Sequence, residues 1–307
     1  MTKLSSRFRF LIRNKTFIKV CCNHFRLKKL RDDNQKDTNK IGRILMKYKY
    51  DCTKPVTFNE HLSWLKFNYR NKMWEKCADK LEAKKFLIEN GFDKYVVKTY
   101  KIYNDSSEIK LDELPNQFVL KTNNDCGSIF VCKKGKTNFE RVFRLLDNAL
   151  KSDYSKFHGE WVYENIEPKI YAEELLESYD GCKLVDYKLF GFNGRFGWGF
   201  AAINRESDTR FTIFEKDYTI QDVDYIYLRP KKGCVPPKPI HYNEMEQITE
   251  KISKILKFVR VDFYETKDGV KIGELTFFSQ SGLGSFTKKC YDYKYGGYFK
   301  DLKHYFS

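Results

Sequence analysis

Hydrophobic and polar positions along the chain follow two periods, one typical of amphipathic helices and one typical of strands. Helical spacing covers residues 57–90, with Gly91 as a C-terminal cap, and residues 137–153. A further helix is predicted to begin at Asn243, where Glu246 completes a capping box. Its apolar stripe comprises Met245, Ile248, Ile252 and Ile255.

Strand-like segments lie between these helices. They cover residues 95–103, 117–121, 129–132, 170–176, 185–192 and 195–203. Four of the seven prolines fall in residues 229–239, which are therefore predicted to form a loop. Helices mixed with short antiparallel strands, without a regular repeat, predict an α+β protein with more than one lobe.

The segment RVDFYETKDGVKIGELTF, residues 260–277, is patterned as a β-hairpin with one apolar face. A three-residue loop over residues 267–269, with a glycine in the left-handed region, keeps the apolar residues of both strands on that face. In this register Asp262 lies opposite Glu274, and Arg260 shares their face. A two-residue turn would instead place the two acids on opposite faces.

Two carboxylates facing each other across a sheet repel one another. A divalent cation would offset this repulsion, because Mg²⁺ takes one or two carboxylates and completes its shell with phosphates and water. The alternative is a solvent-facing strand on which Arg260 neutralises the ordinary surface acids Asp262 and Glu274.

Composition indicates a folded globular protein, with 41% hydrophobic and 17% aromatic residues. No stretch reaches the roughly 18 apolar residues of a membrane-spanning helix, and the first residues lack a secretory signal. Nine cysteines are scattered without a zinc-type spacing. These features favour a protein of a reducing cytoplasm.

The net charge of +16 is concentrated at the start of the chain, because residues 1–31 hold ten Lys or Arg and no Asp or Glu. A polar segment, residues 32–42, is predicted to separate this leader from the folded body. The leader suits an anionic membrane surface or a polyanion, and equally a basic helix packed on the body. No nucleic-acid-binding signature accompanies the charge.

A second group of polar residues follows the strand of residues 117–121. Lys121 ends this strand, and a small polar loop with Gly127 and Ser128 comes next. A lysine beside free backbone N–H groups can hold phosphates, although a surface lysine before an ordinary turn has the same pattern.

The order of these parts resembles the ATP-grasp enzymes, and most closely the TupA-like ATP-grasp proteins related to the teichuronopeptide-synthesis protein of bacterial capsule and cell-surface polysaccharide clusters. The resemblance covers about residues 57–286. It is carried by TFNEHLSWLKFNYRN, CADKLEAKKFL, LPNQFVLKTNN, HGEWVYENIEPKIYAEELL, DYKLFGFNG and FVRVDFYE with GELTFFSQSG.

This resemblance implies a role for each matching residue. Lys80 and Lys121 would contact phosphates with the loop of Gly127 and Ser128. Glu173 and the backbone near Leu175 and Leu176 would hold adenine, and Asp186 would lie near the ribose. Asp262 and Glu274 would bind Mg²⁺, while Arg260, with Lys121, would act on the transferring phosphoryl group.

Some positions depart from the family pattern. Thr276 stands where many relatives have an asparagine metal ligand, and the phosphate loop is poor in glycine. Asp125 would repel a triphosphate unless its carboxylate points away or binds metal.

Arg205, Arg210, Ser281 and Gly282 are the candidate substrate contacts.

The resemblance implies an ATP-grasp fold whose two α+β lobes hold ATP between them. The expected parts are a leader (1–50), a helical lobe (51–114), a small lobe with the phosphate loop (115–172) and a large lobe with the metal site (173–307). The implied activity joins an amine, such as an amino acid, to a uronic-acid carboxylate of an acidic or lipid-linked glycan, in the cytoplasm or at the inner membrane face.

Two other functions stay open. Asp222-Val223-Asp224 is an Asp-x-Asp sequence that a glycosyltransferase could use to bind a nucleotide-sugar metal. The basic leader and the glycine-poor loop would also fit a non-catalytic polyanion or membrane-surface binding protein with a decayed nucleotide site.

Overall fold

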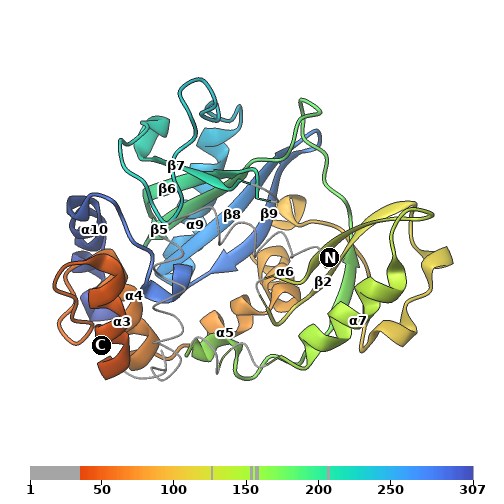
Figure 1. The fold of residues 1–307 in the computed structure, drawn as a ribbon, viewed down its shortest axis with the longest axis horizontal. Helices are drawn as coiled ribbons and strands as arrows, with labels where there is room; N and C mark the ends of the chain where they lie inside the picture. The colour runs from red at the N-terminus through yellow and green to blue at the C-terminus, as the bar shows by residue number, and fades with distance from the viewer. Residues whose placement is uncertain (1–34, 126, 153–154, 156–158, 206–207, 307) are drawn as a thin grey trace, which may run out of the picture. The chain divides into compact units, whose positions relative to one another are not determined.

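The computed structural model describes residues 35–125, 127–152, 155, 159–205 and 208–306, so the basic leader of residues 1–31 lies outside the described residues. The α-helices bounded there are α3 (Gln35–Met46), α4 (Phe58–Asn68), α5 (Lys72–Ala78), α6 (Lys80–Glu89), α7 (Phe139–Leu150), α9 (Tyr242–Leu256) and α10 (Lys289–Gly296) (Figure 1). None of the described helices is long and apolar enough to cross a membrane.

The strands form two sheets. They are β1 (Thr99–Tyr103), β2 (Gln117–Thr122), β3 (Ile129–Lys133), β4 (Ile170–Glu173), β5 (Asp186–Phe192), β6 (Arg195–Ile203), β7 (Arg210–Phe214), β8 (Phe258–Thr266) and β9 (Gly269–Thr276). The sheet orders are β1-β4-β2-β3 and β7-β6-β5-β8-β9. Helices with two antiparallel-rich sheets confirm the predicted α+β class.

Short 3-10 helices connect these elements. They are η1 (Asp93–Tyr95), η2 (Ser106–Glu108), η3 (Leu111–Glu113), η4 (Trp161–Tyr163), η5 (Lys216–Tyr218), η6 (Ser279–Gly282) and η7 (Gly297–Tyr305).

The chain divides into two compact units. Among the described residues, unit 1 contains those up to Tyr69, those of Val185–Arg260 and those from Phe277 onward. Unit 2 contains Arg70–Leu184 and Val261–Thr276, so the chain passes from one unit to the other within β8.

Unit 2 is built on the four-stranded sheet, whose two faces have different chemistry. Phe118 and Leu120 of β2 join a buried apolar cluster with Val142 and Leu146 of α7. Because strand side chains alternate, Val119 and Lys121 lie on the opposite face. The register pairs Lys121 with Tyr171 of β4, which places both on this second face.

Unit 1 packs α9 against β5 and β6. The approach is close, since a Cβ added at Gly191 on β5 would lie 2.6 Å from the Ser253 Cβ of α9. Aromatic rings fill the rest of the core, with ring centroids 4.3 Å apart for Phe190 and Trp198 and 4.4 Å for Trp198 and Tyr295. Such buried aromatic surface supplies much of the stability of a domain.

Several local predictions are confirmed. Residues 195–203 form β6 with the predicted bounds, and the strands at 117–121 and 129–132 pair antiparallel as β2 and β3. Gly91 follows α6 with φ +79°, the left-handed conformation of a C-terminal cap.

Other local predictions are wrong. The helical stretch 57–90 is divided into α4, α5 and α6, because Asn71 and Asp79 each cap a new helix with their side chains. Helix α9 begins at Tyr242 with His241 as N-cap, so Asn243 does not cap it, and Ile255 is exposed. Residues 35–46, placed mostly in a polar linker, form α3 with Ile41 and Met46 buried.

Candidate functional site

Glu173, at the end of β4 in unit 2, holds two lysines on the polar face of the four-stranded sheet. Its Oε2 lies 2.9 Å from Lys84 Nζ, and its Oε1 pairs with Lys121 Nζ. Lys84 also donates to Val97 O at 2.9 Å and to Thr99 Oγ1 at 2.7 Å. Both lysine side chains are 15% exposed and the glutamate side chain 4%, so these charges are largely removed from water.

The electrostatics of this cluster follow from burial and charge. Burial by itself raises the pKa of Glu173, but Lys121 and Lys84 outweigh it and the net pKa is lowered. Burial lowers the pKa of Lys84, opposed by Glu173. A buried carboxylate with two cations leaves one net positive charge on this face, a suitable partner for a phosphate.

The loop after β2 is organised by Asp125. Its Oδ1 accepts hydrogen bonds from Thr122 Oγ1 at 2.8 Å and from Ser128 N at 3.3 Å, and its Oδ2 accepts one from Ser128 Oγ at 2.5 Å. The carboxylate is therefore turned into its own loop. Because the carboxylate points into the loop, its expected repulsion of a bound triphosphate is reduced. The Ser128 hydroxyl, which was predicted to contact phosphate, donates to Asp125 instead.

Helix α6 is anchored to the same loop. Lys80 Nζ donates to the carbonyl oxygen of Asp125, and the N-cap residue Asp79 accepts from Asn123 Nδ2 at 2.9 Å. Asn123 is buried and also donates to Glu167 O at 3.0 Å. Lys80 thus lies at the predicted phosphate loop, and Gly127 lies within it.

The hairpin of β8 and β9 has a shorter turn than the sequence predicted. Strand β8 ends at Thr266 and β9 begins at Gly269, which leaves Lys267 and Asp268 between them. Gly269 does have the expected positive φ, +88°, and Thr266 Oγ1 donates to its carbonyl at 2.7 Å. In an unbroken ladder a two-residue turn places Asp262 and Glu274 on opposite faces.

Burial does not alternate along the whole of β9. Val270 and Ile272 are buried before Gly273, and the consecutive residues Leu275 and Thr276 are both buried after it. A Cβ at Gly273 would lie 2.6 Å from Tyr264 Cε2, so the Tyr264 ring of β8 covers this glycine. The two-residue turn therefore does not support the predicted pairing of Asp262 opposite Glu274 on one face of the hairpin.

Asp262 and Glu274 both belong to unit 2. Asp262 is 2% exposed, and Glu274 is half-buried. Burial, then Glu173, then Glu274 raise the pKa of Tyr171, which lies on the polar face beside Lys121.

In unit 1, Asp186 is buried at the start of β5. Its Oδ2 lies 2.8 Å from Lys188 Nζ and pairs with Arg205 Nη1. Its Oδ1 is also buried and has no hydrogen-bond partner among the described residues. A buried carboxylate oxygen left in this state is available for a ligand hydroxyl.

Arg260 and the η6 turn form another polar group of unit 1. Arg260 Nη1 donates to Ser279 Oγ at 3.1 Å, and Lys66 of α4 donates to Ser281 Oγ at 3.2 Å. Gln280, Ser281 and Gly282 have φ of +51°, +57° and +76°. Consecutive left-handed residues are costly and are concentrated at functional sites.

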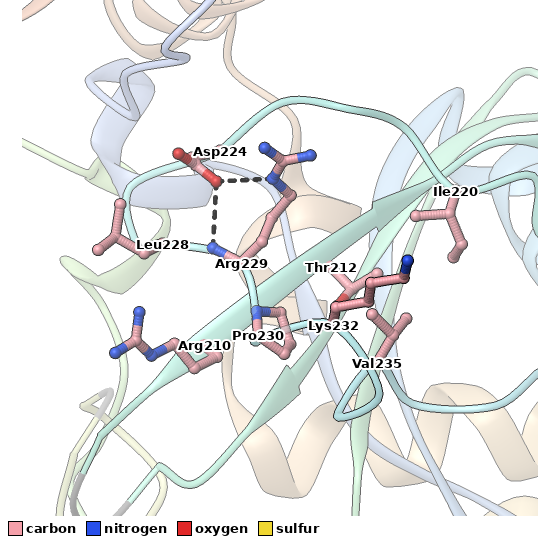
Figure 2. A pocket seen from close by; sticks show the side chains of 9 residues that line it. All are labelled: Arg210, Thr212, Ile220, Asp224, Leu228, Arg229, Pro230, Lys232 and Val235. Carbon is pink, nitrogen blue, oxygen red and sulfur yellow. Dashed lines mark hydrogen bonds and ion pairs between the residues drawn. The ribbon is translucent and has the colours of Figure 1, made fainter.

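Arg210 lies in a hollow on the edge of β7, described below (Figure 2). Nearby, the two acids of the Asp-x-Asp sequence are paired with cations. Asp222 pairs with Arg229 and, at 2.6 Å, with Lys288, and Asp224 lies 2.9 Å from Arg229 Nε. Hydrogen bonds from Lys288 and Arg229 lower the pKa of Asp222 to about 2.

Three lysines of these clusters were missed in the sequence, Lys66, Lys84 and Lys188. Lys84 comes four residues after Lys80 and is one helical turn from it, a spacing that would have identified it. No spacing or motif in the sequence would have identified Lys66. Among the described residues, no group of three or more His, Cys, Asp or Glu is arranged to hold a metal ion.

Unit 2 contains the types of side chain that bind a nucleotide with its magnesium ion, namely cations for the phosphates and carboxylates for the metal. Lys121 and Lys84 are half-buried cations, and Asp262 and Glu274 have the hard carboxylate oxygens that Mg²⁺ prefers. The Asn124 Oδ1 is buried without a hydrogen-bond partner among the described residues. Leu176 lies half-buried just after β4.

Comparison with known proteins gives a family match over most of the chain. Residues 60–300 match the family described as TupA-like ATPgrasp. No curated protein matches.

Similar solved structures include the ATP-grasp ligase PsnB with a minimal precursor, at 12% identity and TM-score 0.41, covering 69% of this chain and 56% of that one. D-alanine–D-alanine ligase from Bacillus anthracis with ATP is 15% identical, with TM-score 0.38 and coverages of 67% and 56%. The Helicobacter pylori enzyme is 16% identical, with TM-score 0.39 and coverages of 73% and 63%. The chain thus spans less than two thirds of each of these structures.

Proposed function

Because the chain belongs to the TupA-like ATPgrasp family, we propose that it is an ATP-dependent ligase that joins a carboxylate to an amine through an acyl phosphate. The family match over residues 60–300 is the observation that carries this proposal. The half-buried lysines around Glu173 support it, since they supply positive charge of the kind that binds a nucleotide phosphate.

The reaction has two steps. A carboxylate oxygen of the acceptor attacks the γ-phosphorus of ATP, the bond to the β-phosphate oxygen breaks, and ADP leaves with an acyl phosphate remaining. The amine nitrogen then attacks the acyl carbon, inorganic phosphate leaves, and the amine loses a proton to give the amide. Negative charge on the phosphoryl oxygens makes cations more valuable here than a protein nucleophile.

Each set of side chains has its own part in this proposal. Lys121 would contact a phosphate directly, with Lys84 and Glu173 keeping its ammonium group in place. Because both carboxylate oxygens of Glu173 are paired with lysines, Glu173 is not proposed to hold adenine as the resemblance implied. Asp262 and Glu274 would hold Mg²⁺, which when bound withdraws charge from the phosphate oxygens. Arg260, fixed through Ser279, would stabilise the transferring phosphoryl group, and Asp186 would accept a ribose hydroxyl.

The acceptor is proposed to be a uronic-acid carboxylate of a bacterial capsule or cell-surface glycan, free or lipid-linked, and the amine an amino acid or a similar compound. Arg205, Ser281 and Gly282 remain predicted substrate contacts. The reaction is placed in the cytoplasm, with the basic leader contacting anionic lipid at the inner membrane face.

One experiment tests this function. The full-length protein would be incubated with Mg-ATP, a panel of amino acids and uronic-acid oligosaccharides, and analysed by mass spectrometry. Coupling with loss of water, together with ADP and phosphate release that depends on both substrates, is the expected result. Titration of Mg-ATP without heat change would contradict it and would favour a protein with a decayed nucleotide site.

A matched pair of variants assigns the nucleotide contact. Lys121→Ala is expected to weaken Mg-ATP binding by roughly tenfold, since charge-assisted contacts contribute about 1.5–3 kcal/mol. Lys133→Ala removes a half-buried lysine from the paired strand β3 and is expected to leave the affinity unchanged. Equal affinities for the two variants would remove Lys121 from the nucleotide site.

A further inference from the structure

Unit 1 contains a hollow of about 470 Å³ on the outer edge of its sheet, where β7 is the terminal strand. Its volume falls in the range of small-molecule sites, about 300–1,000 Å³. Arg210 and Thr212 of β7 line one side, and residues of the segment 220–235 line the other (Figure 2).

The wall of this hollow is fixed by the backbone. Gln221 N donates to Ile213 O at 2.9 Å and Phe211 N donates to Leu228 O at 3.3 Å, so the segment after η5 runs along the free edge of β7. Asp224 Oδ1 accepts from Arg229 N at 3.1 Å and Arg229 Nε at 2.9 Å (Figure 2). These bonds hold the wall in place without a ligand.

Aliphatic side chains form the apolar part of the lining. Ile220, Leu228 and Val235 are 42%, 53% and 40% exposed, and Pro230 lies among them. Single exposed aliphatic residues are common on protein surfaces. Several of them lining one hollow are uncommon and indicate a binding surface.

Charge in the hollow is positive. Arg210 is paired with Asp208 at 2.8 Å, and Arg229 is paired with the two neighbouring aspartates. Lys232 is exposed and makes no hydrogen bond or ion pair with any described residue. It is therefore the cation that an incoming anion would meet first.

Uncompensated polar atoms also line the hollow. Thr212 is 1% exposed, and its Oγ1 is buried without a partner in the part of the chain that the structure describes. Both hydrogen bonds to Asp224 reach Oδ1, so its Oδ2 accepts none from described residues. A ligand with hydroxyl groups would satisfy both atoms.

We propose that this hollow binds an acidic saccharide, with the sugar carboxylate on Lys232 and a C–H face of the ring against Ile220, Leu228 and Val235. A sugar combines an anion, hydroxyl groups and an apolar ring face, and each meets a complementary group here. A flat anionic membrane is the poorer match, because the Thr212 hydroxyl lies in a concavity that a flat surface does not enter.

The hollow would bind the acceptor substrate of the proposed ligase, and this role rests on the proposed function. Binding is measured without ATP, however, so loss of ligase activity and loss of saccharide binding are separate results. A protein that binds the saccharide but ignores Mg-ATP would uphold this site and refute the ligase.

The experiment is a titration of the full-length protein with a glucuronic-acid-containing tetrasaccharide at about 150 mM salt, which screens long-range attraction to the basic leader. Lys232→Ala is expected to weaken binding by roughly fivefold or more. Lys231→Ala removes the adjacent exposed lysine, which does not line the hollow, and is expected to keep the wild-type affinity.

Two further comparisons complete the test. Thr212→Val keeps the side-chain shape and is expected to fold, which circular dichroism checks, and to bind the saccharide more weakly. The neutral glucose tetrasaccharide is expected to bind at least roughly fivefold more weakly than the acidic one. Equal effects of Lys232→Ala and Lys231→Ala, or equal affinities for the acidic and neutral sugars, overturn the proposal. Lys232-dependent binding to phosphatidylglycerol vesicles without saccharide binding overturns it in favour of a membrane surface.

Discussion

Lys84 of α6 and Glu173 of β4 form a buried ion pair, with 2.9 Å between Nζ and Oε2, although 89 residues separate them in the sequence. The pair ties a helix of unit 2 to its sheet and also positions Lys121, which contacts the other carboxylate oxygen. Lys84 lies 5.1 Å from the ring centroid of Tyr171, which adds a cation–π contact.

Glu173→Gln should destabilise unit 2. Removing this charge leaves two largely buried lysines without their carboxylate, and breaking such a pair costs about 3 kcal/mol. Urea denaturation measures the change in unfolding free energy. Glu174→Gln, at the half-buried neighbour, is the control and should change stability by less than about 0.5 kcal/mol. Equal stabilities for the two variants would contradict the central role of Glu173.

Stability should depend on pH through Asp292. This carboxylate of α10 is fully buried and accepts hydrogen bonds from Tyr48 and from Asn59 N and Nδ2 at 3.0 and 2.9 Å. Burial raises its pKa from 3.8 to about 6. The folded protein therefore binds more protons than the unfolded chain between about pH 4 and 6, and this contribution to stability is lost as the pH rises through that window.

Denaturation of the wild type and of Asp292→Asn at several pH values tests this effect. The shift in pKa corresponds to at most about 3 kcal/mol. Because asparagine does not titrate, the wild type should lose stability relative to the variant as pH rises from 4 to 6. A constant difference across this range would show that Asp292 does not titrate there.

Gly282→Ala should destabilise unit 1 by at least about 2 kcal/mol. Its φ is +76°, and a Cβ would lie 2.5 Å from Ser63 Oγ and 2.9 Å from Ser63 N. Gly297→Ala is the matched control, since φ is −56° there and nothing lies within 4 Å of an added Cβ. Thermal denaturation should show a lower Tm for the first variant alone, and an unchanged Tm for Gly282→Ala would argue against the close packing of η6 on α4.

Asp262→Asn and Glu274→Gln should each lower ligase turnover by at least about 100-fold with the fold intact, because each removes a predicted magnesium ligand. Circular dichroism checks the fold, and ADP release measures turnover. Asp268→Asn changes an exposed acid in the turn of the same hairpin and should leave ligase turnover unchanged. Normal turnover in either ligand variant would refute the metal assignment.

Local pattern predicted some strands well, but it missed β7 and made the strands at 95–103 and 170–176 longer than β1 and β4. Residues 195–203 and 117–121 alternate or run apolar between turn residues, and β6 and β2 follow these bounds closely. Helix boundaries were less predictable, because Asn71 and Asp79 interrupt an apolar periodicity that continues across them. Cap hydrogen bonds decide such boundaries, and they depend on backbone geometry as much as on residue type.

By itself, the sequence determined the α+β class, the family resemblance and the presence of a lysine, an arginine and two acids in a recognisable order, since these depend on periodicity and residue identity along the chain. Only the tertiary structure decided that Glu173 lies between Lys84 and Lys121, that Asp125 turns into its own loop, and that the β8–β9 turn has two residues. The reason is physical. Buried charges select their partners in space to offset desolvation, and a one-residue difference in a turn reverses which face a side chain occupies.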